Sequence, residues 1–365
     1  MNETTHGAST DFVAASTSAH TNPEAPFVVD AHAHYFPRML SHSHVVGDPR
    51  WPTLSVRDAD TGFIMLGDKV FRGVRSPLWD TNARMAELDA HNIDAQVVSP
   101  VPILLTYWAD RGPAVSFAQT LNESLAADIA HADGRLYGLG TVPLQDADAA
   151  VRELERVMGD LRLSGVEIGT RVGDKELDDP DLLPFFEAAE SLGAAIFIHP
   201  MDGGGGAIRR SGQPYDFGLG MLTDTAMAAT ALVFGGVLEK FPNLRIGLAH
   251  GCGTFAWAYP RLELGAQITE QTSTIMFDDL VRRLWVDSLV FDRAHLGVLA
   301  HRFGDNQIML GTDYPFIPGQ LEGARELTAS EASDGRRLLG RNALNFIGIP
   351  TPPTVEGHRP LRGER

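Results

Sequence analysis

Eight short apolar runs, each separated from the next by a helical pattern, constrain the fold of this chain more than any other feature. Each run is nearly continuous in apolar residues, as expected for a strand buried on both faces of a parallel sheet. The runs occupy residues 27–34, 95–102, 136–144, 165–170, 194–200, 245–251, 284–290 and 307–314. Strands that alternate with helices form either a doubly wound sheet or a (β/α)8 barrel. Eight runs, with no glycine-rich dinucleotide turn after the first, predict the barrel.

Helical patterns fill the intervals between these runs. The segments DADAAVRELERVM and DPDLLPFFEAAESLG each begin with Asp, a residue that caps helix N-termini, and the second ends at Gly. In TNARMAELDAHN, Thr81 is the predicted capping residue. The segment TAMAATALVFGGVLEKF is apolar almost all round, which predicts a buried helix.

Two intervals are too long to be ordinary loops. Residues 35–80 form an insertion after the first run, in which SVRDADTGFIMLGDKVFR predicts a small hairpin over the barrel mouth. Residues 201–222 contain GGGG and form a second long loop, and residues 318–347 should add helices that close the barrel. Both ends of the chain are polar and predict disordered tails. The predicted organisation is therefore a tail, one barrel domain and a second tail, at residues 1–25, 26–348 and 349–365.

The composition disfavours several classes of partner. The formal net charge of −17 argues against nucleic acid and anionic membranes. No run of about 18 apolar residues stands out, so no membrane-spanning helix is expected. Cys252 is the only cysteine, so no intrachain disulfide can form, and a cytoplasmic location is expected. An anionic substrate would have to be held by individual arginines, against the charge of the whole protein.

The stretch VVDAHAHYFP places two histidines where a metal could bind. His32 and His34 lie two residues apart on a predicted strand and therefore point to the same face. His199, His250 and Asp313 end the fifth, sixth and eighth predicted strands. In a (β/α)8 barrel the carboxyl ends of all strands face one pocket, where the chemistry takes place. These five side chains should therefore meet, which predicts a metal centre.

The motifs DAHAHYFP, FIHP, LAHGCGTF and LGTDYPF resemble, in this order, the signatures of the decarboxylase branch of the amidohydrolase superfamily. The resemblance covers roughly residues 27–347. It implies one divalent metal, with zinc favoured and manganese the alternative, held by His32, His34, His199 and Asp313.

The same resemblance implies the roles of further residues. His250 would be the acid–base residue beside the metal-bound water, and Asp313 would be a catalytic residue as well as a metal ligand. Arg72 in VFRGVR would hold a substrate carboxylate, and Arg261 in AYPRLEL would reach into the neighbouring site of a homodimer. Met201 stands where the most similar members of the branch have a tryptophan near the substrate, so the identity of the substrate stays open.

Three polar residues near these motifs have alternative roles. Glu167 stands where related chains have glutamine, and it either bridges a second metal or is a hydrogen-bonded barrel residue; we expect one metal. Asp30 either orients a metal ligand or donates a proton from the pocket. Asp287 either lines the pocket or satisfies backbone groups. Cys252 beside His250 is expected to be a small buried apolar residue rather than a nucleophile.

Together these features predict a metal-dependent, non-oxidative decarboxylase that acts on an unsaturated or aromatic carboxylic acid. The alternative is a metal-dependent hydrolase or hydratase that uses the same site, because fold does not determine function. A third class, a binding protein with a structural metal, does not need the base His250. The remaining pair of closely spaced histidines, His42 and His44, is expected to be a surface feature.

Overall fold

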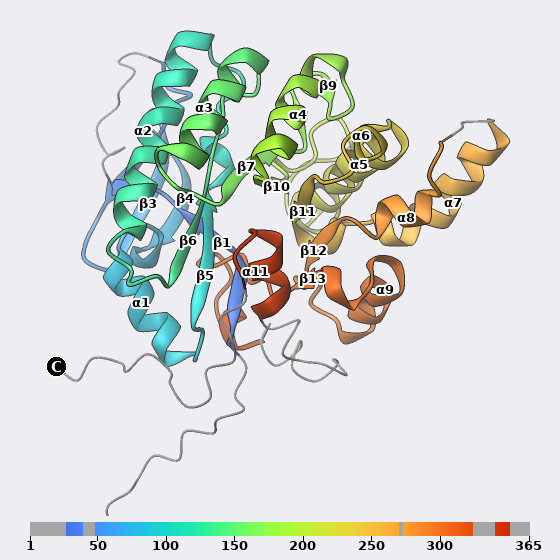
Figure 1. Ribbon diagram of the computed structural model, residues 1–365. Helices are drawn as coiled ribbons and strands as arrows, with labels where there is room; N and C mark the ends of the chain where they lie inside the picture. The colour runs from blue at the N-terminus through green and yellow to red at the C-terminus, as the bar shows by residue number, and fades with distance from the viewer. Residues whose placement is uncertain (1–26, 39–47, 270–272, 324–339, 351–365) are drawn as a thin grey trace, which may run out of the picture. The chain divides into compact units, whose positions relative to one another are not determined.

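Eight parallel strands form the central sheet of the protein, and helices surround it (Figure 1). The computed structural model describes residues 27–38, 48–269, 273–323 and 340–350. In chain order, each strand of this sheet pairs with the next. The strands are β1 (Val29–Tyr35), β5 (Ala95–Pro100), β6 (Leu136–Gly140), β7 (Gly165–Gly169), β10 (Ala195–His199), β11 (Arg245–Leu248), β12 (Trp285–Asp287) and β13 (Ile308–Met309).

The first strand also bonds to the chain that follows the last strand. The backbone N–H of Ala31 donates to the carbonyl oxygen of Leu310, and that of His34 donates to Tyr314, both at 2.7 Å. These bonds join the two edges of the sheet and leave β1 with neighbours on both sides. The predicted (β/α)8 barrel is thereby confirmed.

Helices follow the barrel strands, as the alternating pattern predicts. They are α1 (Thr81–Ala90), α2 (Arg111–Ile129), α3 (Ala147–Gly159), α4 (Leu183–Leu192), α5 (Met221–Phe234), α6 (Val237–Lys240), α7 (Phe255–Ile268), α8 (Phe277–Val281), α9 (Arg293–Phe303) and α11 (Asn342–Phe346). A short ribbon, β8 (Arg171–Val172) and β9 (Lys175–Glu176), lies between β7 and α4. Of the predicted C-terminal helices over residues 318–347, the described residues include α11, which closes the barrel floor: Phe346 packs against Phe197 and Trp285.

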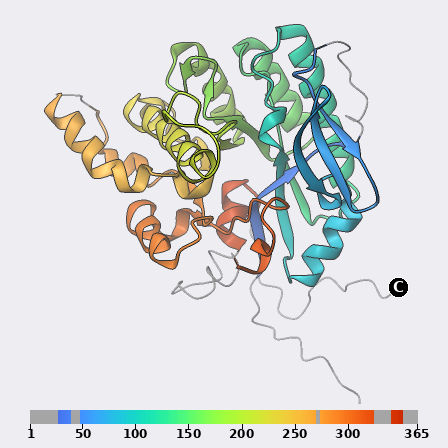
Figure 2. The same cartoon turned by 180° about the vertical axis from the view of Figure 1, so that it is seen from behind.

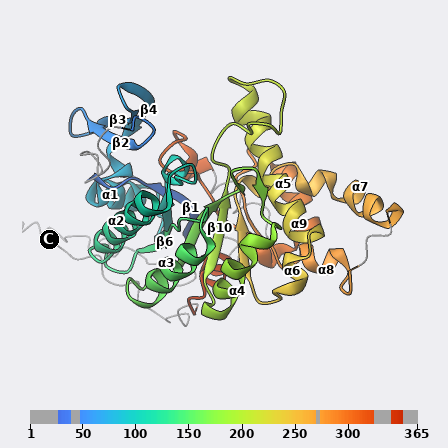
Figure 3. The same ribbon diagram turned by 90° about the horizontal axis from the view of Figure 1, so that it is seen from above.

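The insertion after β1 is larger than the predicted hairpin. It forms a three-stranded antiparallel sheet of β2 (Pro52–Val56), β3 (Thr61–Leu66) and β4 (Lys69–Arg75), visible apart from the barrel strands in Figures 2 and 3. The predicted hairpin segment begins at Ser55 and therefore contains only the last two residues of β2. A separate apolar cluster that includes Trp51, Leu54 and Trp79 attaches this sheet to the chain after β5 and to α2. His42, His44 and the two predicted tails lie outside the described residues.

Two predicted strands end earlier than their apolar runs. β11 ends at Leu248 and β13 at Met309, so His250 and Asp313 lie in the segments that follow. Both residues have a positive φ, 57° for His250 and 56° for Asp313, which is incompatible with a continuing strand. The two side chains are therefore carried by tight turns at the barrel rim.

The expectation that no segment could cross a membrane needs correction. Residues Asp216–Phe234, which include α5, are long and apolar enough to span a bilayer by length and composition alone. The side chains of Thr225, Ala228 and Leu232 are fully buried within the protein, and Asp224 bonds to Thr170. Packing in the interior of the fold explains the apolar residues on the buried side of this helix.

The N-terminus of α1 also differs from the prediction, and the difference generates a test. Asp80, not Thr81, is the capping residue: its carboxylate accepts from the backbone N–H groups of Asn82 at 2.9 Å and Ala83 at 3.1 Å. Asp80→Ala should therefore lower the free energy of unfolding by about 1 kcal/mol, measured by urea denaturation. Thr81→Ala is the matched control and should change it by less than about 0.5 kcal/mol. Equal losses in the two variants would contradict this assignment.

Candidate metal centre

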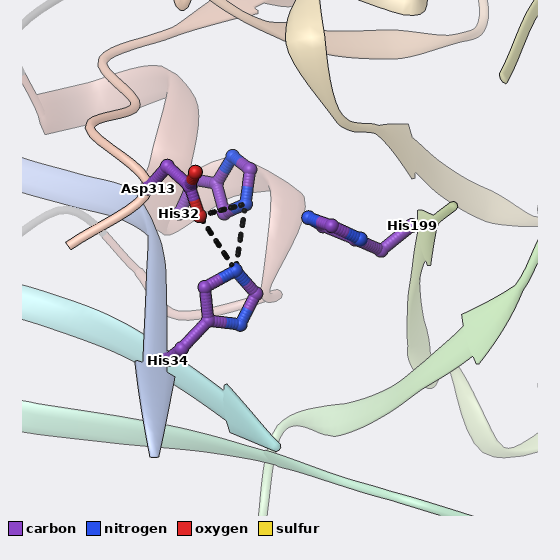
Figure 4. Close-up of side chains that lie close together, drawn as sticks. All are labelled: His32, His34, His199 and Asp313. Carbon is purple, nitrogen blue, oxygen red and sulfur yellow. Dashed lines mark hydrogen bonds and ion pairs between the residues drawn. The ribbon is translucent and has the colours of Figure 1, made fainter. Parts of the chain in front are cut away.

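Four side chains from three separate parts of the barrel converge at its mouth. His32 and His34 come from β1, His199 ends β10, and Asp313 follows β13. All four are buried, and one ligand atom from each lies within 4.8 Å of the others. Figure 4 shows His199 facing the other three from across the site. The structure thus brings together the four residues that the sequence predicted as metal ligands.

The ring nitrogens of His32 and His34 and the carboxylate of Asp313 lie close to one another. The Nε2 atom of His34 lies 3.0 Å from Oδ1 of Asp313 and 3.2 Å from Nε2 of His32. The Nε2 atom of His32 lies 3.8 Å from the same carboxylate oxygen. Two imidazole nitrogens and a carboxylate that face one another in this way provide electron pairs for a cation.

Each histidine uses its other ring nitrogen in a hydrogen bond that sets its tautomer. Nδ1 of His34 lies 3.3 Å from the carbonyl oxygen of Pro100, and Nδ1 of His199 lies 2.8 Å from that of Pro200. A carbonyl oxygen can only accept, so both Nδ1 atoms carry the proton and both Nε2 atoms present a lone pair. Nε2 of His199 is buried and has no hydrogen-bond partner among the described residues. This donor set fits a divalent metal ion.

Asp287 orients the third histidine and settles the choice that the sequence left open. Its Oδ2 atom lies 2.6 Å from Nδ1 of His32 and accepts the backbone N–H of His250 at 2.8 Å. Its Oδ1 atom accepts from Gly251 at 2.8 Å and from Leu289 at 3.0 Å. Asp287 therefore supports the site without lining the pocket. It bonds to the ring of His32 and also accepts hydrogen bonds from backbone N–H groups.

The charge of Asp287 also tunes the basicity of His32. Burial disfavours the charged ring, but the hydrogen bond and charge of Asp287 outweigh it and raise the pKa of His32 to about 9. A more basic Nε2 is a stronger metal ligand, and a proton competes with the metal for it.

His250 lies beside the cluster with its ring free for chemistry. Its ring centroid is 5.0 Å from that of His199 and 5.4 Å from that of His32. Burial lowers the pKa of His250 to about 4, so the imidazole is neutral near pH 7. Its buried Nδ1 has no partner among the described residues. A neutral, unattached imidazole in this place can accept a proton.

Arg72 extends from the insertion toward the metal centre. Its guanidinium carbon lies 4.1 Å from the ring centroid of Phe316, and the Phe316 ring is 5.4 Å from that of His34. Among the described residues Arg72 takes part in no ion pair, so its charge is available to an anionic ligand. Of the other two predicted substrate residues, Met201 is half-buried against Gly169, and Arg261 is exposed on α7.

Hydrogen bonding and burial describe the surroundings of the remaining polar residues. Glu167 accepts a hydrogen bond from Ser99 through Oε2, and burial raises its pKa to about 8. Its buried Oε1 has no hydrogen-bond partner among the described residues, and Glu167 lies outside the group of four ligand side chains. Asp30 is fully buried and accepts three hydrogen bonds, which favours an orienting role over proton donation. Cys252 is fully buried and its pKa is raised, as expected for a packing residue.

Comparisons with known proteins agree with this site and fold. A family model described as amidohydrolase matches residues 29–349. The 2-amino-3-carboxymuconate-6-semialdehyde decarboxylase of Dictyostelium discoideum is 35% identical over 335 residues, which cover 88% of this chain and 91% of that protein.

Two solved structures share the fold. IDCase of Metarhizium anisopliae in apo form has a TM-score of 0.76 at 22% identity, covering 89% of this chain and 98% of its own. Dihydroxybenzoic acid decarboxylase from a Polaromonas species, solved with bound manganese and the inhibitor 2-nitroresorcinol, has a TM-score of 0.68 at 21% identity, covering 89% of this chain and 97% of its own.

The metal content of variants should distinguish residues that bind the metal from residues that only orient a ligand. Substitution of His32, His34, His199 or Asp313 by Ala should abolish stoichiometric metal in elemental analysis, because each supplies a ligand atom. Asp287→Asn should keep some metal but weaken its binding roughly 10- to 100-fold, because the His32 ring loses its charged partner. His131→Ala, an exposed histidine on the surface, is the control and should bind metal normally. Full metal retention in all four ligand variants would refute the assignment.

Proposed function

This chain belongs to the amidohydrolase family, and from that premise we propose that it is a metal-dependent, non-oxidative decarboxylase of an unsaturated or aromatic carboxylic acid. The family match and the 35% identity confirm the resemblance that the motifs indicated. The observation that carries the proposal is His250, a neutral and unattached imidazole beside the four ligand side chains. A metal that served only as a structural clip would need no such group.

The proposed reaction breaks the bond between the carboxylate carbon and the conjugated carbon next to it. Carbon dioxide leaves, the bonding electron pair stays on the conjugated carbon, and that carbon then takes up a proton. A bound divalent metal would supply Lewis-acid polarisation of the substrate. His250 would take up a proton from solvent and deliver it to the carbon that lost carbon dioxide, so the net reaction consumes one proton and releases carbon dioxide.

Arg72 would hold the substrate carboxylate. A planar guanidinium can form two parallel hydrogen bonds to a carboxylate, and the face of Phe316 keeps the group in place. The net charge of −17 repels an anion at long range, but a pair at contact distance in a partly desolvated site is much stronger than a screened, distant field.

Zinc is the metal we propose for this site. Three imidazole nitrogens and one carboxylate oxygen, all buried, are the donor set that zinc favours. Manganese is the alternative, since the Polaromonas decarboxylase was solved with it.

We also propose that two copies of the chain form a homodimer through α7. Trp257, Leu264 and Ile268 are 85%, 53% and 73% exposed and recur with Arg261 at intervals of four, three and four residues, which places all four on one helix face. This α7 stripe lies on a helix that projects away from the barrel (Figures 1 and 3). An exposed apolar stripe of this kind is typical of a protein interface.

The reaction class can be tested with a panel of phenolic and muconate acids. Carbon dioxide should be released from at least one acid, in step with loss of the substrate, only in the presence of the metal. Hydrolysis or hydration products formed without carbon dioxide would instead support the alternative function.

His250→Ala should retain the metal and lose on the order of 10²–10⁴ in turnover, because it removes a positioned acid–base group. Loss of metal in this variant would make His250 a ligand.

Arg72 is tested by the dependence of the rate on substrate concentration. Arg72→Ala should raise KM for the acid by at least about tenfold, because a charge-assisted bidentate pair is lost. Arg72→Lys should rescue poorly, since an ammonium group cannot replace the planar fork. Arg57→Ala, on the exposed outer part of the insertion, is the matched control. Unchanged KM in both Arg72 variants would remove Arg72 from the site.

Arg261 is tested by mixing two inactive variants, His250→Ala and Arg261→Ala. If Arg261 acts in the pocket of the other subunit, each mixed dimer contains one intact site and one site that lacks both residues. With random pairing about half the dimers are mixed, so roughly a quarter of the wild-type activity should return. No recovery after demonstrated subunit exchange, or full activity of Arg261→Ala alone, would contradict the shared site.

A further inference from the structure

Arg84 on α1 is a charged side chain with an unusual environment. Its exposed fraction is 2%, and it is among the largest fully buried side chains of the described residues. No carboxylate lies within ion-pair distance of it in the described parts of the chain. A buried charge without an ion-pair partner is costly, so the hydrogen bonds that Arg84 makes must offset that cost.

The guanidinium of Arg84 joins two neighbouring barrel strands. Nη1 donates to Oε1 of Gln96 on β5 at 2.8 Å, and Nη2 donates to the backbone carbonyl oxygen of His34 on β1. The group also lies 5.1 Å from the ring centroid of Tyr314, the residue after Asp313. Arg84 therefore contacts one metal ligand directly and the neighbour of another.

Gln96 carries this connection further into the barrel. Its Nε2 donates to Oδ2 of Asp30 at 2.8 Å. Because the Gln96 oxygen accepts from Arg84 and its nitrogen donates to Asp30, the orientation of the amide is determined by its partners. The positive charge of Arg84 and the negative charge of Asp30 are thus linked through one amide group.

Asp30 in turn bonds to the backbone of a second ligand and to the residue before a third. Its Oδ1 accepts the backbone N–H of His32 at 3.1 Å, and its Oδ2 accepts the hydroxyl of Thr312 at 2.6 Å. Thr312 precedes the ligand Asp313. Asp30, Gln96 and Thr312 are all fully buried, so water does not compete for these bonds.

We propose that Arg84 is a positioning residue of the metal centre, which acts through Gln96, Asp30 and Thr312 to fix the backbone of three ligands. These ligands are His32, His34 and Asp313. The inference rests on the proposed metal site, and it assigns a role to a helix residue outside the pocket. Arginine suits this role because its rigid fork holds two oxygens on different strands, whereas lysine offers a single point of attachment.

The test measures the dissociation constant of Zn²⁺ for the full-length chain, by competition with a chromophoric chelator. Arg84→Met should weaken binding roughly 10- to 100-fold, as expected when a partner of metal ligands is lost. The Zn²⁺ dissociation constant of Arg84→Lys should lie between those of Arg84→Met and the wild type. Thr312→Val keeps the shape of the side chain and removes only the hydroxyl, and it should weaken binding at least about threefold.

Asn122→Leu is the matched control, because Asn122 is another fully buried polar residue whose hydrogen bonds, to Thr141 and Glu153, do not reach the ligands. It should lower the Tm of the metal-free protein but leave the Zn²⁺ dissociation constant within twofold of wild type. The Arg84 variants should in addition show a smaller rise in Tm on addition of Zn²⁺, since this rise reports affinity for the folded state.

Several outcomes would overturn the proposal. One is unchanged Zn²⁺ affinity in Arg84→Met, and another is an equal loss of affinity in Asn122→Leu. If Arg84→Met fails to fold, Thr312→Val decides: unchanged affinity overturns the proposal, and weaker binding supports it. A wild-type protein that binds no Zn²⁺ or Mn²⁺ would refute the metal site itself, whereas normal wild-type binding with unaffected variants refutes only the role of Arg84.

Discussion

Hydrogen bonds between β1 and the segment after β13 close the barrel, and the candidate site depends on them. The bonds from Ala31 to Leu310 and from His34 to Tyr314 place the two ends of the domain side by side. Asp313 lies between the two acceptors of these bonds in the sequence, so closure brings its carboxylate to 3.0 Å from His34. In an open sheet with the same strand order, β1 and β13 would be opposite edges. The candidate metal centre is assembled because the sheet closes.

Buried polar groups around the site are stabilised by partners that also set their orientation. The ring nitrogens Nδ1 of His32, His34 and His199 each meet an acceptor. Two carboxylates hold His32: Asp287 on β12 bonds to its ring, and Asp30 on the same strand as His32 bonds to its backbone N–H. An unpaired buried polar atom costs about 1–3 kcal/mol, so these contacts restrict the ligands to a narrow set of positions.

The turns that carry His250 and Asp313 have backbone conformations that residues with side chains rarely adopt. Left-handed φ values at such residues cost of the order of 1–3 kcal/mol each. The hydrogen bonds from the backbone N–H groups of His250 and Gly251 to Asp287 offset part of this cost. One carboxylate therefore both orients a ligand and stabilises the turn that places the proposed acid–base residue.

The sequence by itself determined the barrel, because strand and helix periodicities are local properties of the chain. It also predicted that His32, His34, His199, His250 and Asp313 meet, since every strand of such a barrel ends at the same rim. The family resemblance then assigned four of them as ligands and His250 as the acid–base residue. Only the tertiary structure shows the contacts of Asp287, Asp30 and Arg84. A polar residue within an apolar run can face the pocket, the core or a backbone group, and the choice depends on neighbours distant in sequence: Asp287 meets His32, and Arg84 meets the carbonyl oxygen of His34. Those contacts form only when the strands are paired in register and the barrel is closed.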